Sequence, residues 1–512
     1  MQKTAIPALR PRRMGINTHS EPVAYLRADC PVCRSEGFEA RTRVMVQVGA
    51  SSVIATLNIV YGDELLGEGD VGLSEAAWTR LDINSGDTAI LTHTRSLDSM
   101  SHVRSKIYGN RLTHDGLHEI VTDIVAGNYS DIHLAAFLTA SAGNRLDLDE
   151  MTSLTDAMVS AGGRIDWSKL TGTPHPRIMD KHCLGGLPGN RTTPIVVSIA
   201  AANGLIIPKT SSRAITSPAG TADTMETLTR VTLTEEEMRT VVEQEGGCLV
   251  WGGAVSLSPA DDILIRVERA LDIDSEGQMV ASVLSKKIAA GSTHVLIDIP
   301  VGATAKVRSP QAGQHIAHHF EKVGEALGIK VRTLITDGSQ PVGNGIGPAL
   351  EARDVLAVLG NSPDAPEDLR HRALQVAGAL LEMGEAAAPG QGEAMARETL
   401  LSGRALEKLR AICEAQGGFF TPELAQHTRT IHSERTGIVG FINNRLVARL
   451  AKLAGAPAAP GAGLYLHTHL GRRVEKGDVM MTVYAETPGE LAYALEFYDS
   501  HREMLRIEDE SV

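Results

Sequence analysis

The first hundred residues carry apolar side chains at every second position. Val44, Val46 and Val48 alternate with polar neighbours, and the same period continues from residue 53 to residue 61. Strict alternation over such a length predicts half-buried β-strands. The turn-forming residues 84–87 then precede another short apolar run. We therefore predict a small β-rich N-terminal domain over residues 1–100.

The spacing of apolar residues becomes helical from about residue 104. Ser130 is a good N-cap. The apolar positions that follow it are predicted to share one helix face: Ile132, Ala135, Ala136 and Leu138. A second helix is predicted over 148–159, ending at the glycine pair 162–163. We predict a helical domain over residues 101–175, joined by about residues 260–290.

Short apolar runs, interpreted as buried strands, alternate with helical stretches in the middle of the chain. The runs are Pro194–Ala202, Leu249–Trp251, His294–Ile299 and Val331–Thr336. Thr234 and Glu237 form a capping box that predicts a helix reaching about Glu245. Such alternation predicts an α/β domain over residues 176–430, with a central sheet and ligand-binding loops at the strand ends.

The pattern changes again towards the C-terminus. Residues 386–392 read as a loop, and the Gly/Pro/Ala-rich stretch 455–463 reads as a turn region. Two apolar runs follow, at 464–467 and 479–484. We predict a small α+β domain over residues 431–512. The predicted fold class is therefore α/β: a helical domain and a large α/β domain, preceded by a β-rich domain and followed by an α+β domain.

Charge and composition exclude some classes of function. The 512 residues contain 49 basic and 62 acidic side chains, a net charge of −13, and 43% of residues are apolar, as in globular proteins. An acidic chain is a poor binder of nucleic acid polymers, although a local basic pocket for a small phosphorylated ligand remains compatible with it. The most apolar stretch, 195–208, is too short for a membrane span of roughly 20 residues.

The cysteines favour a reducing compartment. Five cysteines in a chain of this length form no disulfide framework, and the N-terminus lacks the apolar core of a secretory signal, so a cytoplasmic location is expected. Cys30 and Cys33 form a lone C-x-x-C without a second ligand pair. We interpret them as two reduced thiols in a loop rather than as a zinc site.

The densest chemical signal is the stretch from Lys181 to Thr193 (KHCLGGLPGNRTT). Its three glycines allow a tight bend that exposes backbone N–H groups, and a lysine and two threonines add further donors. Such a loop suits an anion. It matches neither the nucleotide-triphosphate nor the dinucleotide glycine motif. On composition alone, an ordinary glycine-rich turn between a helix and a strand is an equally good interpretation.

Further clusters strengthen the anion-binding interpretation. Residues 209–221 (KTSSRAITSPAGT) bring together hydroxyls, a lysine and an arginine just beyond a predicted strand, although a solvated Ser/Thr loop has the same composition. The third cluster is residues 279–287 (MVASVLSKK), in which Ser282 and Lys286 are one helical turn apart and share a face. A solvated helix end has the same composition. Residues 336–347 form a fourth, glycine-rich stretch that could be a hinge or a lid.

These residues make the chain resemble the thymidine phosphorylase / AMP phosphorylase family over most of residues 100–512. Lys181-His182 followed by x-x-Gly-Gly is similar to the family's phosphate loop. The Ser-Arg…Thr-x-x-x-Gly-Thr stretch ending at Thr221 and the Ala-Ser-x-Leu-Ser-Lys-Lys stretch ending at Lys287 resemble its other two signatures. The resemblance implies a helical domain and an α/β phosphate-binding domain separated by a cleft that closes. It also implies a β-rich N-terminal domain like that of AMP phosphorylases.

The resemblance also assigns roles to residues. It implies phosphate binding by Lys181, Gly186, Thr193, Ser211, Ser212 and Thr221. It implies substrate binding by Arg213, Ala214, Ile215, Thr216, Ser217, Arg266, Ser282 and Lys306, with Arg266 matching only after a one-residue shift. It implies catalytic roles for Asp274, His182 and Lys286, with Asp274 at the position proposed as proton donor in AMP phosphorylases.

The implied reaction is reversible phosphorolysis of the N-glycosidic bond of a nucleoside or nucleoside 5′-monophosphate. Phosphate is the co-substrate, and neither a metal nor an organic cofactor is expected. The family also implies a homodimer or a larger homo-oligomer, and we expect no nucleic acid polymer or membrane as a partner. A phosphoribosyltransferase of related fold is one alternative, but it would need acidic residues placed for magnesium–diphosphate and Gly-Thr-Gly-Gly-type loops, and neither is found at the matching positions. A non-enzymatic phosphosugar-binding regulator is another, but it would need a DNA-binding or partner-docking module, which nothing in the sequence suggests.

Two departures from the family pattern bear on the substrate. Cys183 stands where the phosphate loop of the family has serine, which replaces a good hydroxyl donor with a weak thiol donor. The stretch from Ser212 to Glu226 is closer to AMP phosphorylases than to short thymidine phosphorylases. A 5′-phosphate needs a site of its own, and Arg213, Lys209 or Lys306 could supply it.

Overall fold

The computed structural model describes residues 8–94, 96–172, 176–214, 217–255, 257–271, 273 and 275–509. The chain divides into two compact units, the first comprising Met1–Ser141 with Ile263–Leu271, and the second comprising Ala142–Asp262 with Asp272–Val512. Each unit is described by itself. In the part of the chain that the structure describes, no helix combines the length and the hydropathy needed to cross a bilayer.

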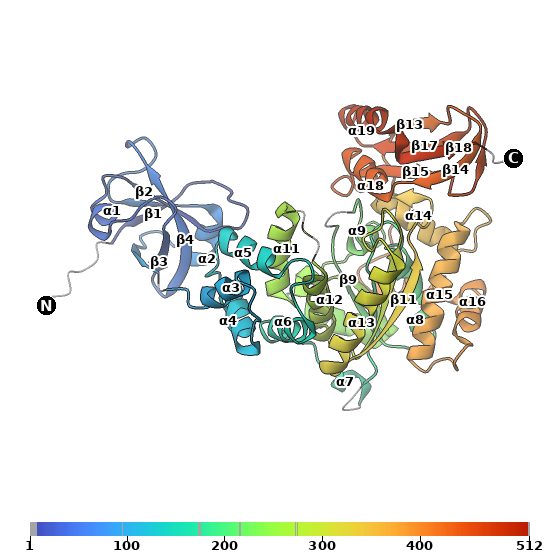
Figure 1. Cartoon of the computed structure of the whole chain (residues 1–512), viewed down its shortest axis with the longest axis horizontal. Helices are drawn as coiled ribbons and strands as arrows, with labels where there is room; N and C mark the ends of the chain where they lie inside the picture. Colours follow the sequence, from blue (N-terminus) through green and yellow to red (C-terminus); the bar gives the residue numbers. More distant parts are fainter. Residues whose placement is uncertain are drawn as a thin grey trace. The chain divides into compact units, whose positions relative to one another are not determined.

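The first unit begins with a six-stranded sheet in the order β1-β5-β2-β4-β3-β6 (Figure 1). Its strands are β1 (Arg10–Arg13), β2 (Val23–Arg27), β3 (Arg43–Val48), β4 (Ser51–Val60), β5 (Asp70–Leu73) and β6 (Ala89–His93). Val44, Val46 and Val48 are buried in its core, as their alternation predicts. The predicted turn also forms, because Asp87 N–H donates to Asn84 O at 3.2 Å.

Helices complete the first unit. They are α1 (Pro31–Glu36), α2 (Glu75–Leu81), α3 (Met100–Ile107), α4 (His114–Val125), α5 (Asp131–Ser141) and the later part of α11 (Pro259–Leu271). Ser130 caps α5 as predicted, accepting from His133 N–H at 3.4 Å. The predicted face of α5 is partly wrong: Leu138 is buried as predicted, but Ile132 is 64% exposed, and Phe137, which was not predicted, is buried. A helix that is apolar on most of its surface gives no clear face from spacing alone.

The loop interpretation of the C-x-x-C pair is also wrong. Cys30 lies at the N-cap of α1 and Cys33 lies inside that helix. Both thiols are buried in the core of the β-rich domain and are unbridged. Pro31 at the first helical position starts the short helix, since its fixed φ suits that position and its missing N–H is not needed there.

The second unit is built around parallel strands. The sheet β11-β10-β7 continues through an isolated parallel bridge between Ile178 and Ile206 into the pair β8-β9. The strands are β7 (Met179–Cys183), β8 (Ile207–Ser211), β9 (Gly247–Trp251), β10 (His294–Val301) and β11 (Lys330–Asp337). Because all five run in parallel, their carboxyl ends lie along one edge, where ligands bind in α/β folds.

The remaining helices of the α/β region lie around this sheet (Figure 1). They are α6 (Leu148–Ser160), α7 (Ser168–Thr171), α8 (Thr192–Ala202), α9 (Thr221–Glu226), α10 (Glu235–Glu245), η1 (Gly252–Val255), α12 (Glu276–Ala289), α13 (Pro310–Ala326), α14 (Pro348–Leu359), α15 (Glu367–Met383), α16 (Gly392–Leu401) and α17 (Arg404–Ala415). The capping box of Thr234 and Glu237 opens α10 as predicted.

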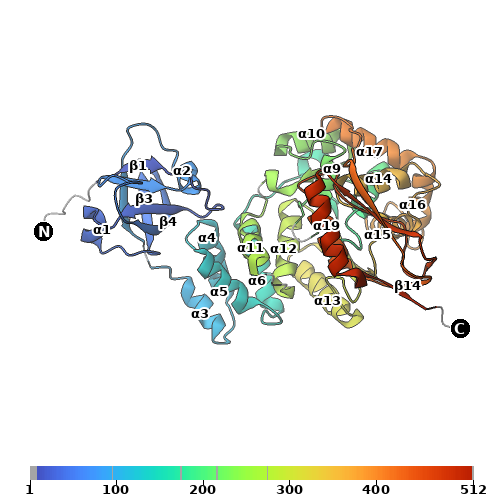
Figure 2. The ribbon, with the colours of Figure 1, turned by 90° about the horizontal axis from the view of Figure 1, so that it is seen from above.

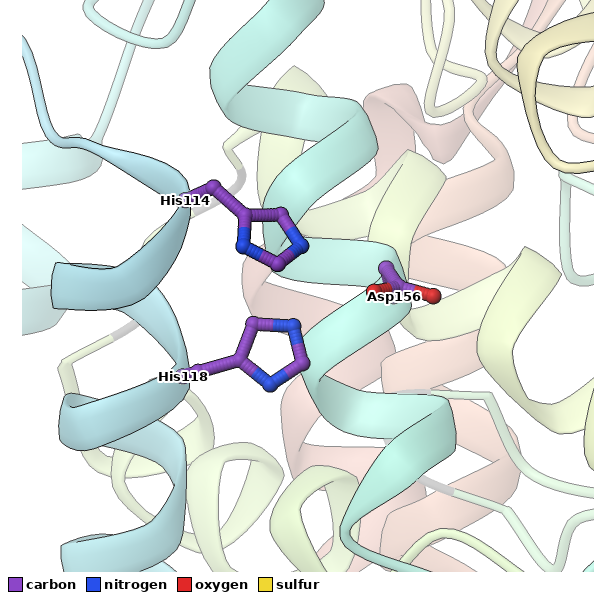
Figure 3. Close-up of side chains that lie close together, drawn as sticks. All are labelled: His114, His118 and Asp156. Atoms are coloured by element: carbon purple, nitrogen blue, oxygen red, sulfur yellow. The ribbon is translucent and has the colours of Figure 1, made fainter.

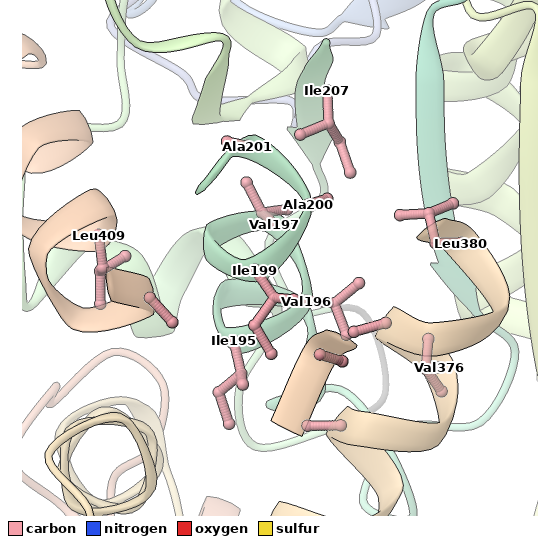
Figure 4. Close-up of a cluster of buried hydrophobic side chains, with 14 of the residues drawn as sticks. Ile195, Val196, Val197, Ile199, Ala200, Ala201, Ile207, Val376, Leu380 and Leu409 are labelled. Carbon is pink, nitrogen blue, oxygen red and sulfur yellow. The ribbon is translucent and has the colours of Figure 1, made fainter. Parts of the chain in front are cut away.

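One predicted strand is a helix. Residues 194–202 belong to α8, which packs between α15 and α17 with Ile195, Val196 and Ile199 fully buried (Figure 4). Ala200 and Ala201 allow this close packing. A helix buried on all sides has the same apolar run as a buried strand, so the sequence pattern does not separate the two.

The C-terminal region carries a four-stranded sheet, β12-β15-β17-β13, and a three-stranded one, β16-β14-β18. Helices α18 and α19 pack together beside the larger sheet (Figure 1, Figure 2). The elements are β12 (Gly345–Ile346), β13 (His427–His432), β14 (Gly437–Ile442), α18 (Asn444–Leu453), β15 (Gly463–Leu466), β16 (Arg473–Val474), β17 (Val479–Ala485), α19 (Pro488–Ser500), η2 (Arg502–Met504) and β18 (Leu505–Glu508). The two predicted apolar runs therefore form β15 and β17.

Candidate active site

Lys181 lies at the centre of the candidate site. Its side chain is fully buried on β7, and its Nζ donates to Thr192 Oγ1 at 2.7 Å and to Thr193 Oγ1 at 3.3 Å, both in the first turn of α8. Among the residues that the structure describes, no carboxylate forms an ion pair with this ammonium group. A buried cation without a counter-ion is unfavourable, so the arrangement suits a bound anion.

The loop between β7 and α8 closes around this ammonium group. Gly186 adopts a positive φ of 58°, which glycine tolerates without strain. Asn190 donates from its side chain to Ala219 O at 3.2 Å, and Thr221 Oγ1 donates to Asn190 O at 3.4 Å. The first and second sequence clusters are therefore in contact, as the resemblance implies for a shared phosphate site.

The second cluster contributes an unpartnered buried hydroxyl. Ser211 ends β8, and its Oγ is buried without a hydrogen-bond partner among the described side chains and backbone. Buried polar groups are normally satisfied, so this hydroxyl is suited to a ligand oxygen. Gly220 leaves room for the chain here, because a Cβ at that position would lie 2.5 Å from Ser212 O.

Two of the cations proposed for a 5′-phosphate are already paired. Arg213 donates to Glu226 Oε1 at 2.7 Å and to Asp223 at 3.2 Å, and its guanidinium stacks over Trp251. Lys209 is buried, with Nζ 3.2 Å from Asp180 and 2.7 Å from Thr210 O. Both side chains therefore have carboxylate partners, and Lys209 shares Asp180 with Lys287.

Asp180 joins two lysines beneath the site and was not identified from the sequence. Its carboxylate lies 3.2 Å from Lys209 Nζ and 2.8 Å from Lys287 Nζ. Burial alone would raise the pKa of Asp180, but the two ammonium groups outweigh it and hold the pKa below its ordinary value. Burial lowers the pKa of Lys287 to about 7, which reduces the positive charge around Asp180 near neutral pH. No spacing signal links Asp180 to Lys287, since they are 107 positions apart.

His182 follows Lys181 on β7. Burial and the charges of Lys287, Lys209, Lys286 and Lys181 lower its pKa well below the ordinary value. Its ring is therefore neutral near pH 7, with one nitrogen that donates and one that accepts. Such a ring can donate to a heterocyclic base without adding a further cation to the site.

The third cluster is a bonded pair held by an aspartate that the sequence did not indicate. Lys286 Nζ donates to Ser282 Oγ at 3.1 Å, which confirms that the two side chains share a face of α12. It also donates to Asp261 Oδ2 at 2.7 Å, and Asp261 is only 2% exposed. Asp261 therefore fixes the position of the Lys286 ammonium group.

Cys183 is the last residue of β7, where the loop that leads to α8 begins, and it is partly buried. It pairs in register with Asp298 of β10, and a Cβ on Gly189 would lie 2.5 Å from its Sγ. Burial and the neighbouring Asp298 raise the pKa of the thiol to about 12, so it remains protonated. Asp298 accepts from Thr336 Oγ1 at 2.6 Å through one oxygen, while its other oxygen is buried and unpartnered among the described residues.

Arg191, the last residue before α8, connects the loop that follows β7 to the C-terminal region. It is buried, donates to Gly345 O, and lies 3.5 Å from both Glu351 and Asp354. Residues 341–343 and 345–347 are buried as well. Most of the stretch 336–347 is thus packed inside the fold, and its interpretation as a hinge or a lid stays a prediction.

The remaining residues that were predicted for the site lie in different parts of the structure, and three of them lie outside the described residues. Arg266 belongs to the first unit, where it donates to Asp131 at 2.7 Å. Ser217 Oγ donates to Ala219 O at 2.8 Å, and Ala214 N–H donates to Asp223 at 2.7 Å. Lys306 is exposed in the turn after β10. Asp274, Ile215 and Thr216 lie outside the described residues.

Three segments of the chain match known domain families. Residues 101–162 match the helical bundle domain of a glycosyl transferase family, and residues 175–406 match the α/β domain of that family. Residues 438–504 match the pyrimidine nucleoside phosphorylase C-terminal domain. These matches confirm the resemblance inferred from the three motifs.

Relatives match over nearly the whole chain. A protein of Hahella chejuensis named "Putative thymidine phosphorylase" is 60% identical over 100% of both chains. Similarly named proteins are 57% identical in Acidovorax sp., over 99% of this chain and 98% of the relative, and 53% identical in Legionella pneumophila, over 100% and 98%.

A solved structure shares the fold at low identity. The crystal structure of anthranilate phosphoribosyltransferase from Thermus thermophilus superposes with a TM-score of 0.51 at 20% identity, covering 62% of this chain and 99% of its own. That likeness concerns the fold alone. Together with the domain matches, it confirms the predicted fold class of a helical domain plus a large α/β domain.

Proposed function

The chain belongs to the glycosyl transferase family that joins a helical bundle domain to an α/β domain, and we propose that it catalyses reversible phosphorolysis of an N-glycosidic bond. An oxygen of inorganic phosphate attacks the anomeric carbon, the bond to the base breaks, and the base leaves with the bonding electrons. The products are a free base and a pentose 1-phosphate, or a ribose 1,5-bisphosphate when the substrate is a 5′-monophosphate.

The buried ammonium group of Lys181 is the observation that carries this proposal. It has hydroxyl partners but no paired carboxylate among the described residues, and it lies beside a loop with a left-handed glycine. Phosphate bound there would gain the lysine charge together with hydroxyl donors such as Thr193 and Ser211. Fixing the nucleophile in this way lowers the entropic cost of the attack.

His182 and Lys286 are suited to the departing base. A pyrimidine can leave as an anion, which a fixed ammonium group and an N–H donor stabilise as its charge develops. Asp261 keeps Lys286 in place with a contact of 2.7 Å. A purine would need a proton donor, the role that we propose for Asp274.

The substrate is a nucleoside or a nucleoside 5′-monophosphate, and the two make different demands on the protein. A 5′-phosphate requires Arg213 or Lys209 to leave its carboxylate partner, or Lys306 to supply the charge. A nucleoside requires none of these changes. We propose that the chain acts without a metal or an organic cofactor, in the cytoplasm, as a homo-oligomer.

The test measures base release from thymidine, uridine, AMP, CMP and UMP without added metal. We expect release from at least one of them only when phosphate is present. Lys181→Ala should abolish it, Thr193→Val should raise the KM for phosphate, and Lys322→Ala, on the exposed surface of α13, should change nothing. Incubation of free bases with 5-phosphoribosyl diphosphate and Mg²⁺ tests the phosphoribosyltransferase alternative. Failure of phosphate-dependent release from every substrate would overturn the proposal.

A further inference from the structure

Two histidines and a glutamate converge at the surface of the second unit, outside the candidate active site. His315 and His319 lie one turn apart on α13, and their ring centroids are 4.4 Å apart. Glu276 is the first residue of the neighbouring helix α12. Its Oε1 lies 2.9 Å from His319 Nδ1 and 3.9 Å from His315 Nε2. Both imidazoles therefore direct a nitrogen at the same carboxylate.

A hydrogen bond between His319 and Glu276 accounts for the position of His319 but not for that of His315. The distance of 3.9 Å to His315 is too long for a second hydrogen bond, yet its nitrogen faces the same oxygen. The donor atoms of the three side chains all lie within 4.8 Å of one another. Tetrahedral zinc, with bonds of about 2.0–2.1 Å, places its ligand atoms about 3.4 Å apart. Small side-chain movements therefore bring all three donors to that spacing.

We propose that Glu276, His315 and His319 bind a divalent transition metal ion of the zinc class. Two imidazole nitrogens and one carboxylate favour Zn²⁺, Co²⁺ or Ni²⁺ over Mg²⁺ or Ca²⁺, which prefer oxygen ligands. Three protein ligands leave a fourth position for water. The side chain of His315 is 54% exposed, which gives the ion access from solvent, while Glu276 and His319 are 21% and 14% exposed.

The site would connect α13 to α12, the helix that carries two residues of the candidate active site. Glu276 begins α12, the helix that carries Ser282 and Lys286 further along. An ion held by α12 and α13 ties the start of that helix to its neighbour. Its effect is on the stability of this packing, and it takes no part in the reaction. The proposal is independent of the proposed phosphorolysis.

The test uses the full chain, freed of metal, with His118→Ala as the parent. That background removes a second histidine pair at the same spacing, His114 and His118 on α4, whose rings are 4.4 Å apart (Figure 3). Zn²⁺ binding is measured by calorimetry, and Co²⁺ coordination by visible absorption. We expect one ion per chain, with the absorption typical of four-coordinate cobalt.

Variants then identify the ligands. His315→Ala and Glu276→Gln should each weaken Zn²⁺ binding by about 100-fold or more, since even the loss of residues that only support metal ligands costs about 10–100-fold. His318→Ala, on the same helix but outside the cluster, should bind as the parent does. Zinc should raise the melting temperature of the parent and not that of His315→Ala, which, being half-exposed, is expected to fold. A parent that binds no Zn²⁺, or binding unchanged in both ligand variants, would overturn the proposal.

Discussion

Cys183 is the residue at which the loop after β7 departs from the phosphate-loop motif of the family that it resembles. Its protonated thiol lies beside Asp298, one oxygen of which is buried without a described partner. A serine hydroxyl is a stronger donor than a thiol. Cys183→Ser should therefore leave kcat intact and leave the KM for phosphate unchanged or lower, as measured by initial rates at varied phosphate. Cys183→Ala is the control that lacks any donor. A loss of activity in a folded Ser variant would mean that the thiol itself has a role.

Glu351 gives the stability of the protein a pH dependence. Burial raises its pKa to about 7, against an ordinary value of 4.5, although Arg191 opposes the shift. The folded chain therefore holds a proton that the unfolded chain has lost, and this stabilisation is present below pH 4.5 and disappears as the pH rises through about 7. We expect the melting temperature to fall between about pH 5 and about pH 8, and to fall less in Glu351→Gln. Parallel melting profiles for the two proteins would contradict this assignment.

Arg191 should be more important for stability than its place in a glycine-rich loop suggests. It is the only described cation within ion-pair distance of Glu351 and Asp354, which are both buried. Removing one partner of a buried ion pair typically costs about 3–5 kcal/mol, because a charge is left uncompensated. Arg191→Ala should lose about that much unfolding free energy, as measured by urea denaturation. Arg353→Ala, on a neighbouring exposed position of α14, is the control and should change it little.

At the scale of elements, α11 and α12 place the Lys286 ammonium group. Asp261 is buried and holds Lys286 at 2.7 Å, whereas its neighbour Asp262 is exposed. We expect Asp261→Asn to lower kcat by about 10-fold or more while the KM for phosphate changes little, because a displaced catalytic group costs rate rather than phosphate affinity. Asp262→Asn is the matched control. Equal losses in both variants, or a rise in phosphate KM alone, would argue against a positioning role for Asp261.

Local patterns predicted elements well where one face is buried and one exposed. The alternation of Val44, Val46 and Val48 and the caps at Ser130 and Thr234 are signals of this kind. They fail for α8, whose surface is buried all round, and for the face of α5. In the candidate site, local composition was enough to single out the hydroxyl and lysine side chains near Lys181. It did not single out Asp180 or Asp261, because their partners are brought near only by the sheet and by helix packing.

At the scale of the whole molecule, the two compact units should unfold separately. The β-rich sheet of the first unit has its own core, as does the sheet of the second unit around α8. Separate cores allow separate cooperative transitions, and a ligand stabilises only the unit that binds it. The proposed phosphate contacts, from Lys181 to Thr221, all belong to the second unit.

Calorimetry of the full chain should therefore show two transitions, of which phosphate raises only one. At a phosphate concentration of 100 times its Kd, that unit gains about 2.7 kcal/mol of unfolding free energy. The shift should be smaller in Thr193→Val at the same phosphate concentration, because that variant lacks a hydroxyl donor beside the Lys181 ammonium group. Phosphate that moves both transitions equally would mean that the units unfold together when it is bound. Phosphate that raises only the transition of the first unit would place its binding site outside the loop that follows β7, and phosphate that raises neither would contradict the proposed phosphate contacts.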